Sequence, residues 1–217
     1  MESFNEVIFN NMFRFKIKDL LIELHLFFWS IFKVTKKLPE GWFYDSEILE
    51  YRRLLNQLPA GATICELGVY RGRSICSVSD IIKRKKLKVI SVDTFQGTGK
   101  DDGLYEETKE IDLKKVFEES LGRFKISSEI YKMTSHEASR LIEAVDLLFI
   151  DADHTYEAVK QDIDDWLPKV KMIISGHDYG NRECPGVASA VNEKFGENNV
   201  ILAKRGLVWS VDLRKTN

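Results

Sequence analysis

The chain has few cysteines: three among its 217 residues, at Cys65, Cys76 and Cys184. Three cysteines at these spacings give neither a disulfide framework nor a CxxC metal motif. Cys65 and Cys76 lie inside apolar runs, where cysteine behaves as a small hydrophobic residue. The sequence therefore argues against a disulfide-stapled fold and favours a reducing compartment, the cytoplasm.

The chain also lacks an excess of charge of either sign. It carries 32 basic and 34 acidic residues, for a net charge of -2 at pH 7. No global field therefore draws the protein to nucleic acid or to an anionic membrane, and a small molecule is the expected partner. With 44% hydrophobic residues, a chain of this length can build one good core, so a single soluble main domain is expected.

A third absence is an apolar run of membrane-spanning length. The most apolar stretch, Asp19 to Val34, is interrupted by Glu23 and His25 and is shorter than the roughly 20 residues that a spanning helix needs. No small-residue cleavage site follows it, so a signal peptide does not fit either. We interpret residues 1–40 as a helical extension. Its residues 19–34 either pack on the domain or on a sister subunit in a homo-oligomer, or make peripheral contact with a membrane.

Residues 41–217 alternate between helical periodicity and short apolar strands. The strands are continuously apolar, which is typical of a parallel sheet covered by helices on both faces. In such α/β sheets, ligands bind beyond the carboxyl ends of the strands. Helices are expected within 41–59 and near 74–83, 111–122, 135–142, 156–166 and 186–195, and strands at 62–68, 88–93, 129–133, 145–151, 171–178 and around 200 and 208.

The segment CELGVYRGRS follows the first of these strands and opens a helix. Gly68 and Gly72 would let the backbone turn sharply and approach a ligand, although they could serve the strand-helix turn alone. The spacing is not the GxGxxG of dinucleotide-binding folds, which disfavours a nicotinamide or flavin oxidoreductase. Glu66 would repel a pyrophosphate and could instead attract an ammonium group.

Asp93 ends the second strand, 25 residues after Gly68. An acid at this place accepts hydrogen bonds from the hydroxyls of a ribose, although Asp93 could instead cap a helix. In this order, ELGVYRGRS and Asp93 resemble motif I and the ribose-binding acid of the class I S-adenosylmethionine-dependent methyltransferases, and RGLVWSVDL resembles their closing antiparallel strand. The resemblance implies a Rossmann-like three-layer sandwich with a seven-stranded, mostly parallel sheet over residues 41–217. It also implies cofactor contacts from Glu66, Gly68, Gly72, Ser74, Asp93, Ser135 and Asp151.

The stretch from Asp146 to Tyr179 carries FIDADH, WLP and GHDY. It is similar to the metal-dependent small-molecule O-methyltransferases, and still more to a branch associated with sugar and polysaccharide modification. The resemblance implies that Asp151, His177 and Asp178 hold a divalent cation, either Mg²⁺ or a transition metal such as Mn²⁺. Such a cation lowers the pKa of an acceptor hydroxyl.

His154 stands where some of these enzymes place a lysine base, so it is the candidate general base, with Asp151 as the alternative. The chain departs from the pattern in two places. Lys171 and Met172 replace a frequent double glycine, and the metal pair is His-Asp rather than Asp-Asp or Asp-Asn. His177 could therefore be a hydrogen-bonding or structural residue in a metal-free site.

The expected function is methyl transfer to a hydroxyl of a small molecule, with a sugar or glycan precursor favoured. The alternatives are a metal-independent methyltransferase and a binding or assembly protein that keeps the cofactor fold without catalysis. Asp153 could serve only to cap the helix that follows it. The polar loop from Phe95 to Thr108 is expected to be either a lid over the site or a surface loop.

Overall fold

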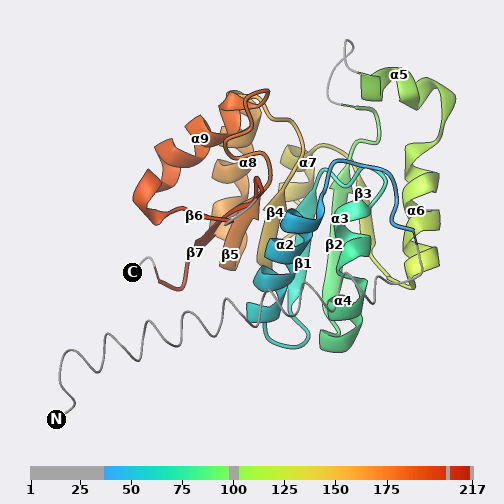
Figure 1. The fold of residues 1–217 in the computed structure, drawn as a ribbon, viewed down its shortest axis with the longest axis horizontal. Helices are drawn as coiled ribbons and strands as arrows, with labels where there is room; N and C mark the ends of the chain where they lie inside the picture. The colour runs from blue at the N-terminus through green and yellow to red at the C-terminus, as the bar shows by residue number, and fades with distance from the viewer. Residues whose placement is uncertain (1–36, 98–102, 204–205, 216–217) are drawn as a thin grey trace. The chain divides into compact units, whose positions relative to one another are not determined.

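The computed structural model describes residues 37–97, 103–203 and 206–215. Its centre is a seven-stranded sheet in the order β3-β2-β1-β4-β5-β7-β6 (Figure 1). Five strands pair in parallel, and β7 runs antiparallel to both of its neighbours. The predicted fold class, with its antiparallel closing strand, is thereby confirmed. The strands are β1 (Thr63–Leu67), β2 (Lys88–Asp93), β3 (Glu129–Lys132), β4 (Val145–Ile150), β5 (Val170–Gly176), β6 (Ile201–Leu202) and β7 (Trp209–Asp212).

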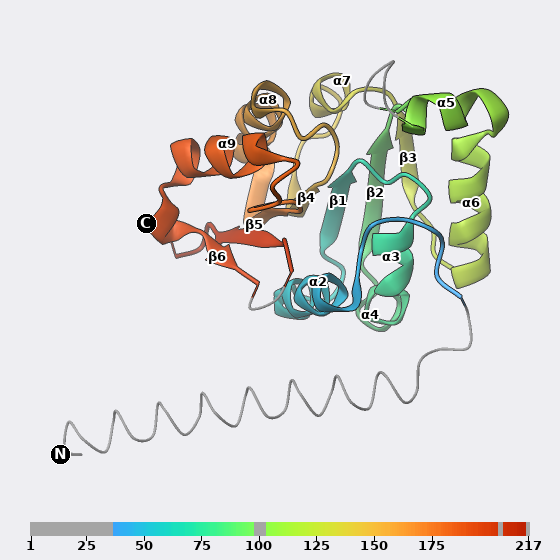
Figure 2. The same ribbon diagram turned by 45° about the horizontal axis from the view of Figure 1, so that its top comes forward.

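Helices cover both faces of the sheet (Figure 2). α7 (Ser135–Ser139), α8 (Tyr156–Trp166) and α9 (Pro185–Phe195) lie along one face. The other face carries α2, α3 and α4, with α6 beside α3. Their bounds are α2 (Asp45–Gln57), α3 (Arg73–Ser77), α4 (Ser79–Lys85) and α6 (Leu113–Phe124); short 3₁₀ turns follow α8 (Leu167–Lys169) and α9 (Glu197–Asn199).

The core depends on the continuous apolar strands at the centre of the sheet. Four of the five residues of β1 and five of the six of β4 are buried, as a sheet covered on both faces requires. On the α8 face, Trp166 and Trp209 are among the largest fully buried side chains. Burial of this kind contributes roughly 25 cal/mol per Å² of apolar surface removed from water.

Strand order reverses between β1 and β4, because the chain winds outward from β1 to β3 and then returns to the other side of β1. Loops that leave neighbouring strands at such a switch point diverge to opposite faces, so the carboxyl edge opens there. Gly68 follows β1 and Asp151 follows β4, so the two polar segments of the sequence meet at this point.

The structure differs from the sequence prediction at two helices. Val78 divides the helix expected near residues 74–83, so that α3 and α4 form separate turns. Part of the loop expected over residues 95–108 is instead α5 (Gly103–Glu110). The sequence GLYEETKE is rich in helix formers, which outweigh its glycine and threonine. Residues 98–102 of that loop lie outside the described residues.

The predicted N-terminal extension, including residues 19–34, also lies outside the residues that the structure describes, apart from residues 37–40. Arg73 donates hydrogen bonds to the carbonyls of Pro39 and Phe43, and Arg71 pairs with Glu40. The chain is thus tied to the domain from Pro39 onward, within the compact unit that begins at Leu38. Within the described ranges, no helix combines the length and the apolar character that crossing a membrane requires.

Candidate active site

A cavity of ≈ 870 Å³ lies at the carboxyl edge of the sheet. It is lined by the segments that follow β1 to β5, as the alternation of strands and helices predicts. Of the predicted site residues, the lining includes Gly68, Ser74, Asp93, Ser135, Asp151, His154, His177 and Asp178. Glu66 and Gly72 are absent from it.

Asp93 anchors the loop that follows β1. Its Oδ2 accepts hydrogen bonds from the backbone amides of Val69 and Tyr70, at 2.8 and 2.9 Å, and its Oδ1 accepts one from the amide of Phe95. A carboxylate has about four acceptor positions, so Asp93 keeps one with which to accept from a ribose hydroxyl. The Asp93 carboxylate therefore sets the shape of the loop that follows β1, called the cofactor loop below, and the same carboxylate faces the cavity.

The two glycines of the loop serve the packing of the protein itself. Gly68 has φ +81°, and a Cβ there would lie 2.0 Å from the carbonyl oxygen of Asp151. Gly72 has φ +82°, and its Cβ would lie 2.9 Å from the ring of Phe117. Gly68 also lines the cavity, so its missing side chain brings the β1 and β4 loops together at the site. Gly72 does not line the cavity, and its missing side chain makes room for the ring of Phe117.

Glu66 lies beneath the cavity, with 1% of its surface exposed. Its carboxyl accepts hydrogen bonds from the hydroxyls of Tyr51 and Ser74. Burial raises its pKa from 4.5 to about 8, which keeps most of the side chain protonated at pH 7. Its contact with the cofactor stays a prediction, whereas its hydrogen bond to Ser74 links it to a residue that does line the cavity.

Ser135 begins α7 at the far end of the cavity. Thr134 caps this helix through a capping box with Glu137, and Thr134 and Ser135 both line the cavity. The Ser135 hydroxyl donates to Asp162, a buried acid whose pKa burial raises to about 6. The cofactor contact expected of Ser135 stays a prediction, and the structure adds Asp162 as the residue that orients its hydroxyl.

The structure brings together the four polar residues that follow β4 and β5. His154 Nε2 lies 3.4 Å from Asp151 Oδ1 and 3.2 Å from Asp178 Oδ2. His177 Nδ1 lies 3.0 Å from Asp178 Oδ2 and 3.6 Å from Asp151 Oδ1. The two imidazoles therefore face the same pair of carboxylates.

This cluster shifts the ionisation of its members. Burial lowers the pKa of His177, but hydrogen bonds to Asp151, Asp178 and Glu47 outweigh burial and raise that pKa to about 12. For His154, burial again lowers the pKa, and Asp151 and Asp178 raise it by more. For Asp178, burial raises the pKa and His177 lowers it by more, to about 2. Without a bound cation, His177 is thus held as an imidazolium that offsets part of the negative charge of the carboxylates around it.

Glu47, on α2, is a site residue that the sequence analysis did not identify. Its Oε1 lies 3.1 Å from His177 Nε2, and both side chains are buried. Glu47 lies one helical turn before the buried Tyr51, so a carboxylate on the apolar face of a helix was the available signal. By holding one ring nitrogen, Glu47 turns the other toward Asp151 and Asp178.

The residues of this cluster fit a divalent cation. Ligand atoms of Asp151, His177 and Asp178 all lie within 4.8 Å of one another. Metal-bound imidazoles usually donate their second ring nitrogen to a carboxylate, as His177 can to Glu47. A set of two carboxylates and one imidazole suits Mn²⁺ or another transition metal better than Mg²⁺.

One part of the cavity wall combines aromatic and polar side chains. Trp42 and Tyr44 are 61% and 59% exposed, and both line the cavity. Trp42 stacks on Tyr70, with ring centroids 5.5 Å apart. Asn181 donates to Asp178 Oδ1 at 2.6 Å. Trp42 and Tyr44 could not be predicted as site residues, because nothing in a single sequence places the segment before α2 beside the loops that follow β1 and β5.

Asp153 also lines the cavity, but its contact is local. Its Oδ1 accepts from the backbone amide of Thr155 at 2.8 Å, and Thr155 caps α8. The capping role weighed for Asp153 is therefore wrong in detail, because Thr155 is the N-cap of α8 and Asp153 accepts from the backbone amide of that cap.

The chain is similar to known methyltransferases in sequence and in structure. A family described as "Methyltransferase domain" matches residues 65–179, just over half of the chain. The O-methyltransferase NovP is similar over 77% of this chain and 79% of its own, at 20% identity and a TM-score of 0.59. A putative caffeoyl-CoA O-methyltransferase from Staphylococcus aureus is similar over 94% and 99%, at 14% identity and a TM-score of 0.56. No curated protein sequence matches the chain.

A putative rRNA methylase from Clostridium thermocellum is similar over 79% of this chain and 99% of its own, at 11% identity and a TM-score of 0.54. At such identities, structural similarity shows the shared fold and does not distinguish a small-molecule acceptor from RNA. The choice of acceptor therefore depends on the chemistry of the site.

Proposed function

The chain belongs to the methyltransferase domain family and is an S-adenosylmethionine-dependent methyltransferase; on this premise, we propose that it methylates a hydroxyl of a small molecule, a sugar or glycan precursor. We further propose that Asp151, His177 and Asp178 hold a divalent cation during the reaction. S-adenosylmethionine supplies an electrophilic methyl group on a positively charged sulfur.

The observation that carries the proposal is the position of His154. Its Nε2 lies 3.4 Å from Asp151 Oδ1 and 3.2 Å from Asp178 Oδ2. His154 lines the same cavity as Gly68 and Asp93. A basic nitrogen beside two carboxylates, close to the cofactor loop, suits removal of a proton from an acceptor hydroxyl. In this role His154 Nε2 takes the proton, and Asp178 stabilises the imidazolium that forms.

The other residues of the site bind and orient the reactants. Asp93 holds the cofactor loop and offers its remaining acceptor position to a ribose hydroxyl. Glu47 fixes the ring of His177, and Asn181 fixes the carboxylate of Asp178. These contacts keep the reacting groups in place before the acceptor enters, which is how an active site lowers the entropic part of a barrier.

The mixed wall of the cavity supports a sugar acceptor. Exposed aromatic side chains such as Trp42 and Tyr44 offer apolar faces, while Asn181 and Glu183 offer hydrogen-bonding groups nearby. A sugar ring presents both kinds of surface, and sites that combine apolar walls with a few polar groups bind such small ligands. The near-zero net charge gives no support to an RNA acceptor.

Calorimetric titration with S-adenosylhomocysteine, followed by a turnover screen over sugars and nucleotide sugars, tests the proposal. We expect micromolar binding and methylation of at least one sugar hydroxyl. His154→Gln should lower kcat by about 10²–10⁴-fold while S-adenosylhomocysteine binding is retained. His136→Gln is the matched control, because His136 is an exposed histidine paired with Asp165. Equal loss in both variants, or full activity of His154→Gln, would remove His154 from the mechanism.

A metal-independent methyltransferase is a second candidate, favoured by the ion pairs of His177. Glu47, Asp151 and Asp178 surround this imidazolium, so protein carboxylates alone stabilise its charge without a bound cation. Turnover with and without a chelator separates the two candidates. Undiminished activity in chelator would assign His177 a structural role, and loss of activity that Mn²⁺ restores would support the cation.

A further inference from the structure

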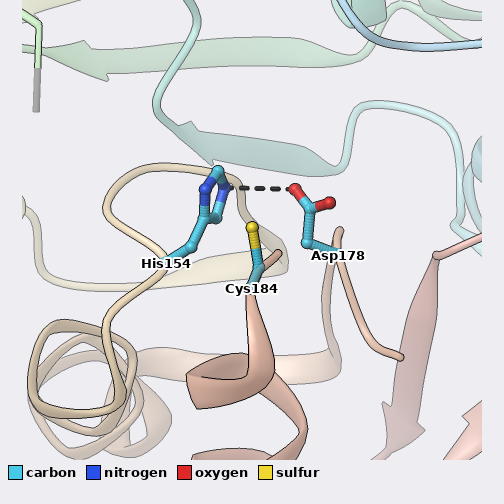
Figure 3. A group of neighbouring side chains, drawn as sticks. All are labelled: His154, Asp178 and Cys184. Atoms are coloured by element: carbon cyan, nitrogen blue, oxygen red, sulfur yellow. Dashed lines mark ion pairs between the residues drawn. The ribbon is translucent and has the colours of Figure 1, made fainter. Parts of the chain in front are cut away.

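A histidine, a carboxylate and a thiol converge at the edge of the cavity (Figure 3). His154 lies in the loop before α8, Asp178 follows β5, and Cys184 directly precedes α9. Figure 3 shows the imidazole and the carboxylate facing each other, with the sulfur of Cys184 directed toward the space between them. The ligand atoms of the three residues all lie within 4.8 Å of one another, and all three residues line the cavity.

We propose that His154, Asp178 and Cys184 form a binding site for a thiophilic divalent cation such as Zn²⁺. Zn²⁺ is bound tetrahedrally by nitrogen, oxygen and sulfur ligands at about 2.0–2.3 Å, which places neighbouring ligand atoms roughly 3.3–3.8 Å apart. His154 Nε2 and Asp178 Oδ2 are 3.2 Å apart, close to that spacing. Three protein ligands leave a fourth position open to the cavity, as in catalytic zinc sites.

Surrounding residues hold the ligands of this site in place. Asn181 Nδ2 donates to Asp178 Oδ1 at 2.6 Å, which leaves Oδ2 directed toward His154. The same amide lies 3.6 Å from Cys184 Sγ, and the backbone amide of Cys184 donates to the carbonyl of Asn181. One asparagine therefore orients both the carboxylate and the thiol. Residues that orient ligands in this way contribute strongly to metal affinity.

The proposed site is chemically distinct from the neighbouring group of Asp151, His177 and Asp178. The two groups share only Asp178, and only the proposed site contains sulfur. Hard cations such as Mg²⁺ prefer oxygen ligands, whereas thiolate ligands select Zn²⁺ and related ions. If the proposed function holds, Zn²⁺ bound to His154 also occupies the nitrogen that would take the acceptor proton, so Zn²⁺ should inhibit methyl transfer.

Co²⁺ binding, followed by absorption spectroscopy of the full-length protein, tests the site directly. Co²⁺ replaces Zn²⁺ in such sites and gives a sulfur-to-cobalt charge-transfer band only when a thiolate is bound. We expect this band in the wild-type protein and its loss in Cys184→Ser. Asp153→Asn should keep the band, because the Asp153 carboxylate accepts from the backbone amide of Thr155 and belongs to neither group. His154→Gln should weaken Zn²⁺ binding at least tenfold in a competition titration with a chelator.

Cys65 and Cys76 remain in Cys184→Ser and report any thiolate band from elsewhere in the chain. A band that persists in Cys184→Ser, or that is absent from the wild type, would overturn the proposal, and so would its loss in Asp153→Asn. S-adenosylhomocysteine titration of the same samples checks that each variant is folded. Failure of the wild type to bind S-adenosylhomocysteine would contradict the proposed function and leave the spectroscopic result on the cation site standing.

Discussion

Glu66 illustrates how burial changes the ionisation of a single side chain. Burial raises its pKa from 4.5 to about 8, and the hydroxyls of Ser74 and Tyr51 offset only part of this effect. Between these two pH values, the folded protein keeps a proton that the unfolded chain loses. The stability that depends on this proton is therefore fully present below about pH 4.3 and is lost as the pH rises toward 8.

The Glu66→Gln substitution should remove this pH dependence. Glutamine has nearly the shape of the protonated acid and cannot ionise, so it keeps hydrogen-bonding capacity toward Ser74 and Tyr51. Relative to the variant, the wild type should lose about 1.4 kcal/mol of unfolding free energy per pH unit between about pH 5 and 8. Urea unfolding at four pH values measures this difference. Glu119→Gln, at an exposed position on α6, is the control, and its unfolding free energy should differ from the wild type's by the same amount at every pH. A difference between the wild type and Glu66→Gln that does not change with pH would contradict the raised pKa of Glu66.

Glu47 acts through the imidazole of His177, from which it lies 3.1 Å. If His177 is a metal ligand, Glu47→Gln should weaken Mn²⁺ binding about 10–100-fold, because a glutamine fixes the ring less strongly than a carboxylate does. Electron paramagnetic resonance of free Mn²⁺ in a titration gives the affinity. S-adenosylhomocysteine binding should be unchanged.

Glu50→Gln is the control on the same helix, since Glu50 pairs with Arg53. Equal Mn²⁺ affinity in the wild type and Glu47→Gln would show that His177 does not need Glu47 to bind a metal. That result would favour the structural role for this histidine.

At the scale of secondary structure, the β1 loop depends on close contact with the β4 loop. Gly68→Ala would place a Cβ 2.0 Å from the carbonyl oxygen of Asp151, at φ +81°. Gly61→Ala has nearly the same backbone angle, φ +77°, with no atom within 4 Å of its Cβ. The second substitution should cost only the conformational strain of about 1–2 kcal/mol. Gly68→Ala should lower the unfolding free energy by several kcal/mol more, because the backbone at Asp151 must move to make room for the added Cβ.

Denaturant unfolding of the two variants, together with S-adenosylhomocysteine titration, checks this comparison. Gly61→Ala should keep wild-type affinity, and Gly68→Ala should lose it because the loop that lines the cavity is displaced. Equal destabilisation of the two variants would mean that the β1 and β4 loops separate easily.

The elements that could be predicted from sequence are those whose local pattern agrees with their tertiary surroundings. The helix expected at residues 156–166 is α8, although its N-cap is Thr155 and not Asp153, the residue considered for that role from the sequence. The break at Val78 and the start of α5 at Gly103 were not predicted, because neither proline nor a change in periodicity marks them. Propensity alone does not determine where the sheet allows a helix to continue.

The candidate site follows the same rule. Asp93, Asp151 and the His177-Asp178 pair were identified because each ends a strand, and parallel strands bring such residues to one edge. Glu47 and Cys184 reach the cluster from helix α2 and the segment before α9. Their positions depend on how those helices pack on the sheet, which a single sequence does not encode as a local pattern.

At the scale of the whole molecule, the described sheet, core and cavity are built from the unit that begins at Leu38. The first cavity residue is Gly41, and Arg71 and Arg73 contact Glu40 and Pro39. A chain that begins at Lys37 should therefore fold, with unfolding free energy within about 1 kcal/mol of the full chain's. It should also bind S-adenosylhomocysteine with the same affinity, because no described contact of the cavity is removed.

The same truncation separates the interpretations of residues 19–34, and packing of this stretch on its own domain would appear as a loss of unfolding free energy in the truncated chain. If this apolar stretch packs on a sister subunit, sedimentation should show a homo-oligomer for the full chain and a monomer for the truncated one. If it contacts a membrane, the full chain alone should sediment with anionic lipid vesicles, while both chains remain monomers in solution. We expect the first result, because Glu23 and His25 interrupt the apolar stretch, while a subunit interface tolerates polar groups among its apolar contacts. Vesicle binding by the full chain without self-association would contradict that expectation and assign the segment to the membrane surface.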